Sequence, residues 1–223
     1  MNPLAAVLFD LDGTLIDTAP DFAVVVNQLR KRHNHPPLSY AEVRATVSNG
    51  ARALVTLALK LKEGDAGFDE SRQELLQLYE QNLAVETCLF PGMSNVLEHL
   101  EQCQIPWGIV TNKPRKYAEP ILAALQLHER CATLVCPDDV AKTKPDPEPM
   151  YLACKHIQCS PEHTLYLGDH RRDIDAGKNA AMKTLAVNYG YIGEDDPSTE
   201  WLADFYVDHA DEIIPLLKQH FHY

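Results

Sequence analysis

The chain has 223 residues, of which 45% are hydrophobic and 23% are charged, a composition typical of a soluble protein with one large domain and a smaller second unit. Its net charge of -12 at pH 7 argues against nucleic acid or a membrane surface as a partner, because binding to such polyanions requires a basic face. A small phosphorylated metabolite is still compatible with this charge, since a metal ion and a few local cations suffice to bind it.

Other global features indicate where the protein works. No apolar run approaches the roughly 20 residues of a membrane-spanning helix. The N-terminal apolar run is short and ends in two aspartates, which is unlike a signal peptide. The six cysteines contain no Cys-x-x-Cys pair, as expected of reduced thiols. We therefore expect a cytoplasmic protein, either a monomer or a homodimer.

The first predicted element is a strand at residues 4–9, whose apolar run indicates burial on both faces. Asp10 and Asp12 follow it two residues apart, so both carboxylates can point into the crevice at the edge of an open sheet. Gly13 permits a tight backbone path, and Thr14 adds a hydroxyl group. Two carboxylates this close repel each other unless a cation lies between them, and Mg2+ suits such oxygen ligands. The alternative is a polar turn with a capping aspartate.

The next segment carries only helical signals. Capping-box patterns at residues 18–21 and 39–42 predict two helix starts, and Asn49-Gly50 interrupts the second helix. Helical periodicity resumes at residues 51–61 and again at residues 69–84. We therefore predict a helical cap domain at residues 16–85, inserted after the first strand, where such units commonly serve as lids.

Strands and helices alternate through the rest of the chain, which predicts an α/β fold with a doubly wound, Rossmann-like parallel sheet. The core domain then comprises residues 1–15 and 86–223. Polar residues follow two of its predicted strands, with Thr111 and Asn112 after residues 105–110 and Asp169 after residues 164–167. Because the carboxyl ends of parallel strands meet at one edge of the sheet, these side chains are expected to converge with the two N-terminal aspartates.

Four motifs, in this order, resemble those of the haloacid dehalogenase-like hydrolase superfamily, most of whose members are Mg2+-dependent phosphohydrolases. The motifs are Asp10-Leu11-Asp12-Gly13-Thr14, Thr111-Asn112, Lys144-Pro145 and Gly168-Asp169-His170-Arg171-Arg172-Asp173. The resemblance implies a catalytic group of Asp10 (nucleophile), Asp12 (general acid and base), Thr111 and Lys144, with Gly13 and Asn112 binding substrate. From spacing alone, Thr111-Asn112 is more often a turn and Lys144 a solvated surface charge.

The resemblance also implies a Mg2+ site. Its ligands would be Asp10, the backbone carbonyl of Asp12 and Asp169, with Asp173 ligating or orienting through a water molecule. Taken alone, Asp173 is also consistent with a carboxylate that merely favours a helix N-terminus. The implied reaction is phosphoryl transfer through an aspartyl-phosphate. Dehalogenases of the superfamily need neither a metal nor the second carboxylate, so Asp12 argues against dehalogenation.

Within the superfamily the chain is similar to the phosphoglycolate phosphatase group and, more closely, to the bacterial N-acetylmuramic acid 6-phosphate phosphatases of cell-wall recycling. The segments that carry this similarity lie at residues 50–53, 110–114, 118–121, 144–149, 152–155 and 189–191. The implied substrate is N-acetylmuramic acid 6-phosphate or 2-phosphoglycolate. Both carry a carboxylate that Arg52 of the insert could bind, although an exposed arginine is equally consistent with the spacing. A sugar phosphomutase and a non-catalytic phosphate-binding protein are the alternatives.

Overall fold

The computed structural model describes residues 2–193 and 195–223. The chain forms two compact units, and the larger one comprises Met1–Ile16 and Leu89–Tyr223. The smaller unit is the segment between them, Asp17–Cys88. The chain passes between the units at two short strands, β3 (Ile16–Asp17) and β4 (Cys88–Leu89).

The larger unit is built on a six-stranded parallel sheet with the strand order β6-β5-β2-β7-β8-β9. Every residue of the central strands β2, β5 and β7 is buried. The strands are β2 (Ala6–Phe9), β5 (Trp107–Val110), β6 (Leu134–Val135), β7 (Thr164–Gly168), β8 (Lys183–Val187) and β9 (Phe205–Val207). This arrangement confirms the predicted α/β class. The chain winds from β2 to one edge and later from β7 to the other, so the winding direction changes at β2, a position where such sheets bind ligands.

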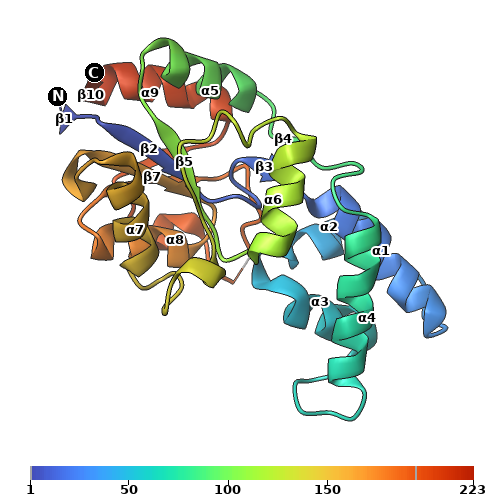
Figure 1. Ribbon diagram of the computed structural model, residues 1–223. Helices are drawn as coiled ribbons and strands as arrows, with labels where there is room; N and C mark the ends of the chain where they lie inside the picture. The colour runs from blue at the N-terminus through green and yellow to red at the C-terminus, as the bar shows by residue number, and fades with distance from the viewer. Residues whose placement is uncertain (1, 194) are drawn as a thin grey trace. The chain divides into compact units, whose positions relative to one another are not determined.

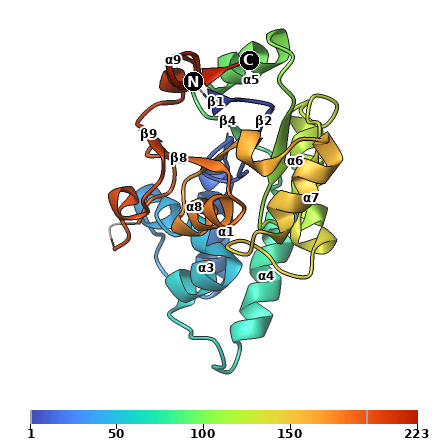
Figure 2. The same ribbon diagram turned by 90° about the vertical axis from the view of Figure 1, so that its left-hand side faces the viewer.

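Helices cover both faces of this sheet. Figure 1 shows α5 and α9 above the sheet and α7 and α8 below it, and Figure 2 shows the same layers from the side. The helices of this unit are α5 (Met93–Gln102), α6 (Arg115–Ala124), α7 (Glu148–Ile157), α8 (Arg171–Asn179) and α9 (Ile213–His220). A two-residue parallel pair, β1 (Asn2–Pro3) with β10 (Phe221–His222), brings the two ends of the chain together. The sequence did not predict this pair, because two residues show no periodicity.

The smaller unit is helical. Its helices are α1 (Ala19–Arg32), α2 (Tyr40–Arg44), α3 (Gly50–Leu59) and α4 (Phe68–Gln81). Phe22 of α1 stacks on Tyr79 of α4 with ring centroids 4.1 Å apart. The predicted capping box at Ser39 and the break at residues 49–50 are confirmed. Helix α3 ends two residues earlier than predicted, because Lys60 adopts a left-handed conformation with φ of 61°. Helix α4 likewise ends at Gln81 rather than at residue 84.

The capping box predicted at residues 18–21 was wrong. Thr18 is the N-cap of α1 but makes no side-chain capping hydrogen bond. The Asp21 carboxylate, which a capping box would use locally, is buried and instead accepts hydrogen bonds from the backbone of residues 85–87. A buried carboxylate is stabilised by several N–H donors at once, and the returning chain supplies more of them than the helix start does.

Within the part of the chain that the structure describes, no helix combines the length and the apolar character needed to cross a bilayer.

Candidate active site

The end of β2 fixes the position of Asp10. The Asp10 N–H donates to the Leu167 carbonyl at 2.8 Å, which extends the contact between β2 and β7 by one residue. Its Oδ1 accepts a hydrogen bond from the Leu11 N–H at 2.7 Å and lies 2.8 Å from the Lys144 ammonium. Both of these contacts are made through Oδ1. One carboxylate oxygen of Asp10 is therefore held in place by a backbone N–H and an ammonium.

Asp12 has a different partner. The Lys113 ammonium donates a hydrogen bond to Asp12 Oδ1 at 2.9 Å, and the two side chains are only 7% and 18% exposed. Sequence reasoning missed Lys113. The available signal was its place two residues beyond Thr111, in the loop that follows one predicted strand, since Asp12 lies in the loop that follows another. The pairing of β2 with β5 brings these two loops together.

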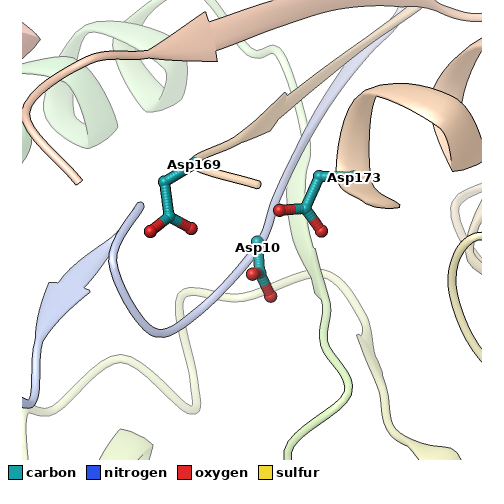
Figure 3. Close-up of side chains that lie close together, drawn as sticks. All are labelled: Asp10, Asp169 and Asp173. Atoms are coloured by element: carbon teal, nitrogen blue, oxygen red, sulfur yellow. The ribbon is translucent and has the colours of Figure 1, made fainter. Parts of the chain in front are cut away.

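Three predicted metal ligands converge. The carboxylates of Asp10, Asp169 and Asp173 offer oxygen atoms that all lie within 4.8 Å of one another, and Figure 3 shows Asp10 between the other two. Asp169 follows β7, and Asp173 lies in the first turn of α8. This acidic trio of clustered, largely buried oxygen donors fits a hard divalent cation. The Asp12 side chain is not part of the trio, and the part predicted for its carbonyl oxygen stays a prediction.

Neighbouring backbone packs tightly around Asp169. A Cβ atom on Gly13 would lie 2.0 Å from Asp169 Oδ2, and Gly13 has a φ of 84°, so only glycine fits there. The Thr14 hydroxyl donates to Asp169 Oδ1 at 3.3 Å, and the Tyr191 N–H donates to Oδ2 at 2.8 Å. Sequence reasoning assigned no role to Tyr191, because a backbone donor has no side-chain signature.

Lys144 is a buried cation and not a surface charge. Its ammonium lies near the carboxylates of Asp10 (2.8 Å) and Asp173 (2.7 Å), the Val110 carbonyl (3.0 Å) and the Tyr166 hydroxyl (2.9 Å). An ammonium has three protons, so four nearby acceptors commit it fully. Burial opposes its charge, yet the two carboxylates hold the pKa of Lys144 above its usual value. Burial also raises the pKa of Asp10 to about 6, against the lowering effect of Lys144.

The remaining predicted site residues of the larger unit form hydrogen bonds within and between the loops around the site. The Thr111 hydroxyl accepts a hydrogen bond from the Lys113 N–H at 3.1 Å. The Asn112 amide donates to the Lys144 carbonyl at 3.1 Å, which ties the loop after β5 to the loop before α7. Lys142, two residues before Lys144 in the same loop, is by contrast 72% exposed. Contacts of Thr111, Asn112 and Gly13 with a substrate stay predictions.

Arg52 lies in the smaller unit, near the start of α3. Its side chain is 59% exposed and forms an ion pair with Glu63, which is also exposed. The described residues thus place Arg52 on the surface of its unit, and its predicted contact with a substrate carboxylate stays a prediction.

Comparison with known proteins identifies the family. Residues 7–187 match the family described as haloacid dehalogenase-like hydrolase. The chain belongs to this family. The membership predicted from four short motifs is thereby confirmed, and the converging aspartates occupy the positions of the first and fourth motifs.

Individual relatives cover nearly the whole chain. It is 45% identical, over 97% of its length and 96% of the relative, to a protein of Pseudomonas aeruginosa named N-acetylmuramic acid 6-phosphate phosphatase. It is 40% identical, over 93% of its length and 94% of the relative, to a phosphoglycolate phosphatase of Xanthomonas campestris. A crystal structure of a predicted phosphoglycolate phosphatase from Haemophilus somnus is similar with a TM-score of 0.84 at 27% identity, covering 97% of this chain and 99% of that one.

Proposed function

We propose that this protein is a Mg2+-dependent phosphatase that hydrolyses a small phosphomonoester through an aspartyl-phosphate on Asp10. The observation that carries the proposal is the Asp10 carboxylate, whose Oδ1 is held by Leu11 and Lys144 and which clusters with the carboxylates of Asp169 and Asp173. Relatives of 45% and 40% identity that are named phosphatases support the same reaction class.

The residues divide the chemistry between two half-reactions. Asp10 Oδ2 attacks phosphorus, so that a bond from Asp10 to phosphorus forms while the bond from phosphorus to the ester oxygen breaks. Asp12 gives its proton to the departing oxygen. Asp12 then takes a proton from the water that attacks phosphorus, and inorganic phosphate leaves Asp10. Lys144 stabilises the Asp10 carboxylate in its ionised, nucleophilic form.

Asp10, Asp169 and Asp173, together with the Asp12 backbone carbonyl, would hold Mg2+. When bound, the ion offsets the repulsion between the attacking carboxylate and the phosphate. The trio fits a divalent cation because it carries three carboxylates. Among the described residues, the single positive charge of Lys144 balances only part of their negative charge. The Thr111 hydroxyl, the Asn112 amide and the backbone at Gly13 would bind the phosphoryl oxygens.

We infer N-acetylmuramic acid 6-phosphate as the substrate, which places the enzyme in cell-wall recycling. The 45% identity over 97% of the chain to a phosphatase named for this substrate supports the inference. Phosphoglycolate is the second candidate, supported by the 40% identity to a phosphatase named for it. Both esters carry a carboxylate in addition to the phosphate. A cytoplasmic location belongs to the same proposal and agrees with the six free cysteines.

The test is a comparison of specificity constants in the presence of Mg2+. The substrates are N-acetylmuramic acid 6-phosphate, 2-phosphoglycolate and N-acetylglucosamine 6-phosphate, which lacks only the lactyl ether with its carboxylate. We expect stoichiometric phosphate release and the highest kcat/KM for N-acetylmuramic acid 6-phosphate. Formation of an isomeric sugar phosphate without free phosphate would instead show a phosphomutase. Binding of all three esters without turnover would show a non-catalytic protein.

A further inference from the structure

Lys113 forms a partly buried ion pair with the proposed general acid and base. Its ammonium lies 2.9 Å from Asp12 Oδ1, with 7% of the lysine side chain exposed. Burying a lysine side chain to this extent costs desolvation energy and side-chain entropy. A short charge-assisted hydrogen bond offsets these costs. The contact is therefore a built feature of the site and unlike an exposed surface pair.

The backbone of Lys113 is held on both sides. Its N–H donates to the Thr111 hydroxyl at 3.1 Å, and the next residue, Pro114, is the N-cap of α6. Strands β2 and β5 are neighbours, with Phe9 opposite Ile109, so Asp12 and Lys113 come from adjacent loops at one edge of the sheet. The scaffold thus determines where the ammonium can reach.

The two lysines of the site serve different aspartates. Lys144 contacts Asp10 and Asp173 and has two further acceptors, the Val110 carbonyl and the Tyr166 hydroxyl. No ion pair joins Lys144 to Asp12 in the described part of the chain. The orientation of Asp12 therefore has a determinant that is separate from the one that orients Asp10.

We propose that Lys113 is a positioning residue for Asp12. Its hydrogen bond to Oδ1 fixes the plane of the carboxyl group, so that Asp12 faces the ester oxygen when it donates its proton and faces the water when it accepts one. Lys113 itself exchanges no proton and forms no bond to the substrate. This inference rests on the proposed phosphatase function.

The test distinguishes an effect on proton donation by Asp12 from an effect on the other functions of the site. Rapid-quench measurements follow phosphorylation of Asp10 by two esters, namely p-nitrophenyl phosphate and the alkyl phosphate that the wild type hydrolyses fastest. An alkoxide leaves only with a proton from Asp12, whereas p-nitrophenolate leaves without one. In Lys113→Met we expect the rate with the alkyl phosphate to fall roughly 10- to 100-fold, the worth of one hydrogen bond to a charged group. The rate with p-nitrophenyl phosphate should stay within about threefold.

Two further variants complete the design. Lys113→Arg retains the charge and should recover a large part of the lost rate, which also guards against a misfolded Lys113→Met protein. Lys183→Met is the matched control, because it removes a lysine that contacts Asp204 at 2.6 Å in the same unit, and it should leave both rates unchanged.

The outcomes distinguish the two proposals. Equal losses on both esters, or no loss on either, would overturn the positioning role of Lys113 while the phosphatase function stands. A wild-type protein that neither phosphorylates Asp10 nor releases phosphate would overturn the phosphatase function and, with it, the role of Lys113.

Discussion

Individual side chains distinguish the two carboxylates of the first motif. Asp10 contacts Lys144, whereas Asp12 contacts Lys113. Identical residue types two positions apart thereby acquire different environments, as the proposed roles of Asp10 as nucleophile and Asp12 as proton carrier require. The difference could not be predicted from the sequence. It depends on the fold, which brings two loops beside the end of β2, namely the loop after β5 with Lys113 and the loop before α7 with Lys144.

Amide variants of the two aspartates should separate their roles. We expect Asp10→Asn and Asp12→Asn each to lower turnover by at least about 100-fold, because an amide neither attacks phosphorus nor transfers the proton. With p-nitrophenyl phosphate, mass spectrometry should detect a phosphorylated Asp12→Asn protein, since this ester needs no proton donor. The circular dichroism spectra of both variants should match the wild type.

The same mass-spectrometric measurement can also contradict the assignment of Asp10. A phosphorylated Asp10→Asn protein would show that another residue is the nucleophile, and the assignment of Asp10 would have to be withdrawn.

Elements as well as side chains shape the site, and the turn after β8 is one of them. The Tyr189 hydroxyl donates to the Thr14 carbonyl at 3.0 Å, and the Tyr191 N–H donates to Asp169. Between them, Gly190 approaches so closely that an added Cβ would lie 2.2 Å from Asp169 Cβ. The turn therefore packs directly against Asp169, the proposed metal ligand. The similarity to relatives at residues 189–191 did not reveal this contact.

Gly190→Ala is expected to weaken metal binding. The added methyl group must displace Asp169 or the turn, and we expect the apparent Kd for Mg2+ to rise about 10-fold, because displacing one ligand or its support typically costs 10- to 100-fold. Isothermal titration calorimetry measures this directly. Gly193→Ala is the control, because among the described residues a Cβ there would meet no atom within 4 Å apart from its neighbours in the chain. Equal Kd values for the two variants would remove the supporting role of the turn.

The start of α1 illustrates a second element whose function depends on distant backbone. Asp21 accepts hydrogen bonds from the N–H groups of Val85, Glu86 and Thr87 and from the Thr87 hydroxyl, the last at 2.6 Å. These contacts close the smaller unit on itself, since they join its first helix to its last residues. The capping interpretation failed because sequence shows a carboxylate near a helix start but not the donors that arrive some sixty residues later.

Asp21→Asn should destabilise the smaller unit. An amide nitrogen would face N–H donors and leave at least one of them unpaired, which costs about 1–3 kcal/mol in the free energy of unfolding. Urea denaturation followed by circular dichroism measures this loss. Asp69→Asn is the control, since its side chain is 80% exposed in α4, and it should change the stability by less than about 0.5 kcal/mol. An unchanged free energy of unfolding in Asp21→Asn would contradict the proposed stabilising role of these hydrogen bonds.

The elements themselves were predictable to different degrees. The strands that place the site have continuous apolar runs, which carry a strong signal, and the change to helical spacing after residue 16 is equally clear. Two-residue strands such as β1 and β10 have no such signal, and helix ends depend on single backbone conformations, as at Lys60. Prediction therefore succeeded for elements whose buried residues recur regularly along the chain. It failed where a single contact or backbone conformation determines the structure.

Across the whole molecule, the proposed chemistry and the proposed specificity lie in different units. The acidic trio, Lys113 and Lys144 all belong to the larger unit, whereas Arg52 belongs to the smaller one. If the inserted unit selects the substrate, changes there should alter which ester is hydrolysed without altering how the phosphoryl group is transferred.

Arg52→Ala tests this division. A guanidinium can bind a carboxylate with two parallel hydrogen bonds, and such a contact lies away from the phosphorus. We expect kcat/KM for the carboxylated substrate to fall roughly 10-fold, while kcat/KM for p-nitrophenyl phosphate, which has no carboxylate, stays nearly constant. Glu63→Gln is the control, because it removes the present partner of Arg52 and keeps the guanidinium, so it should not lower kcat/KM for either ester. Equal losses on both esters in Arg52→Ala would show that Arg52 supports the fold of its unit, and the specificity role would be abandoned.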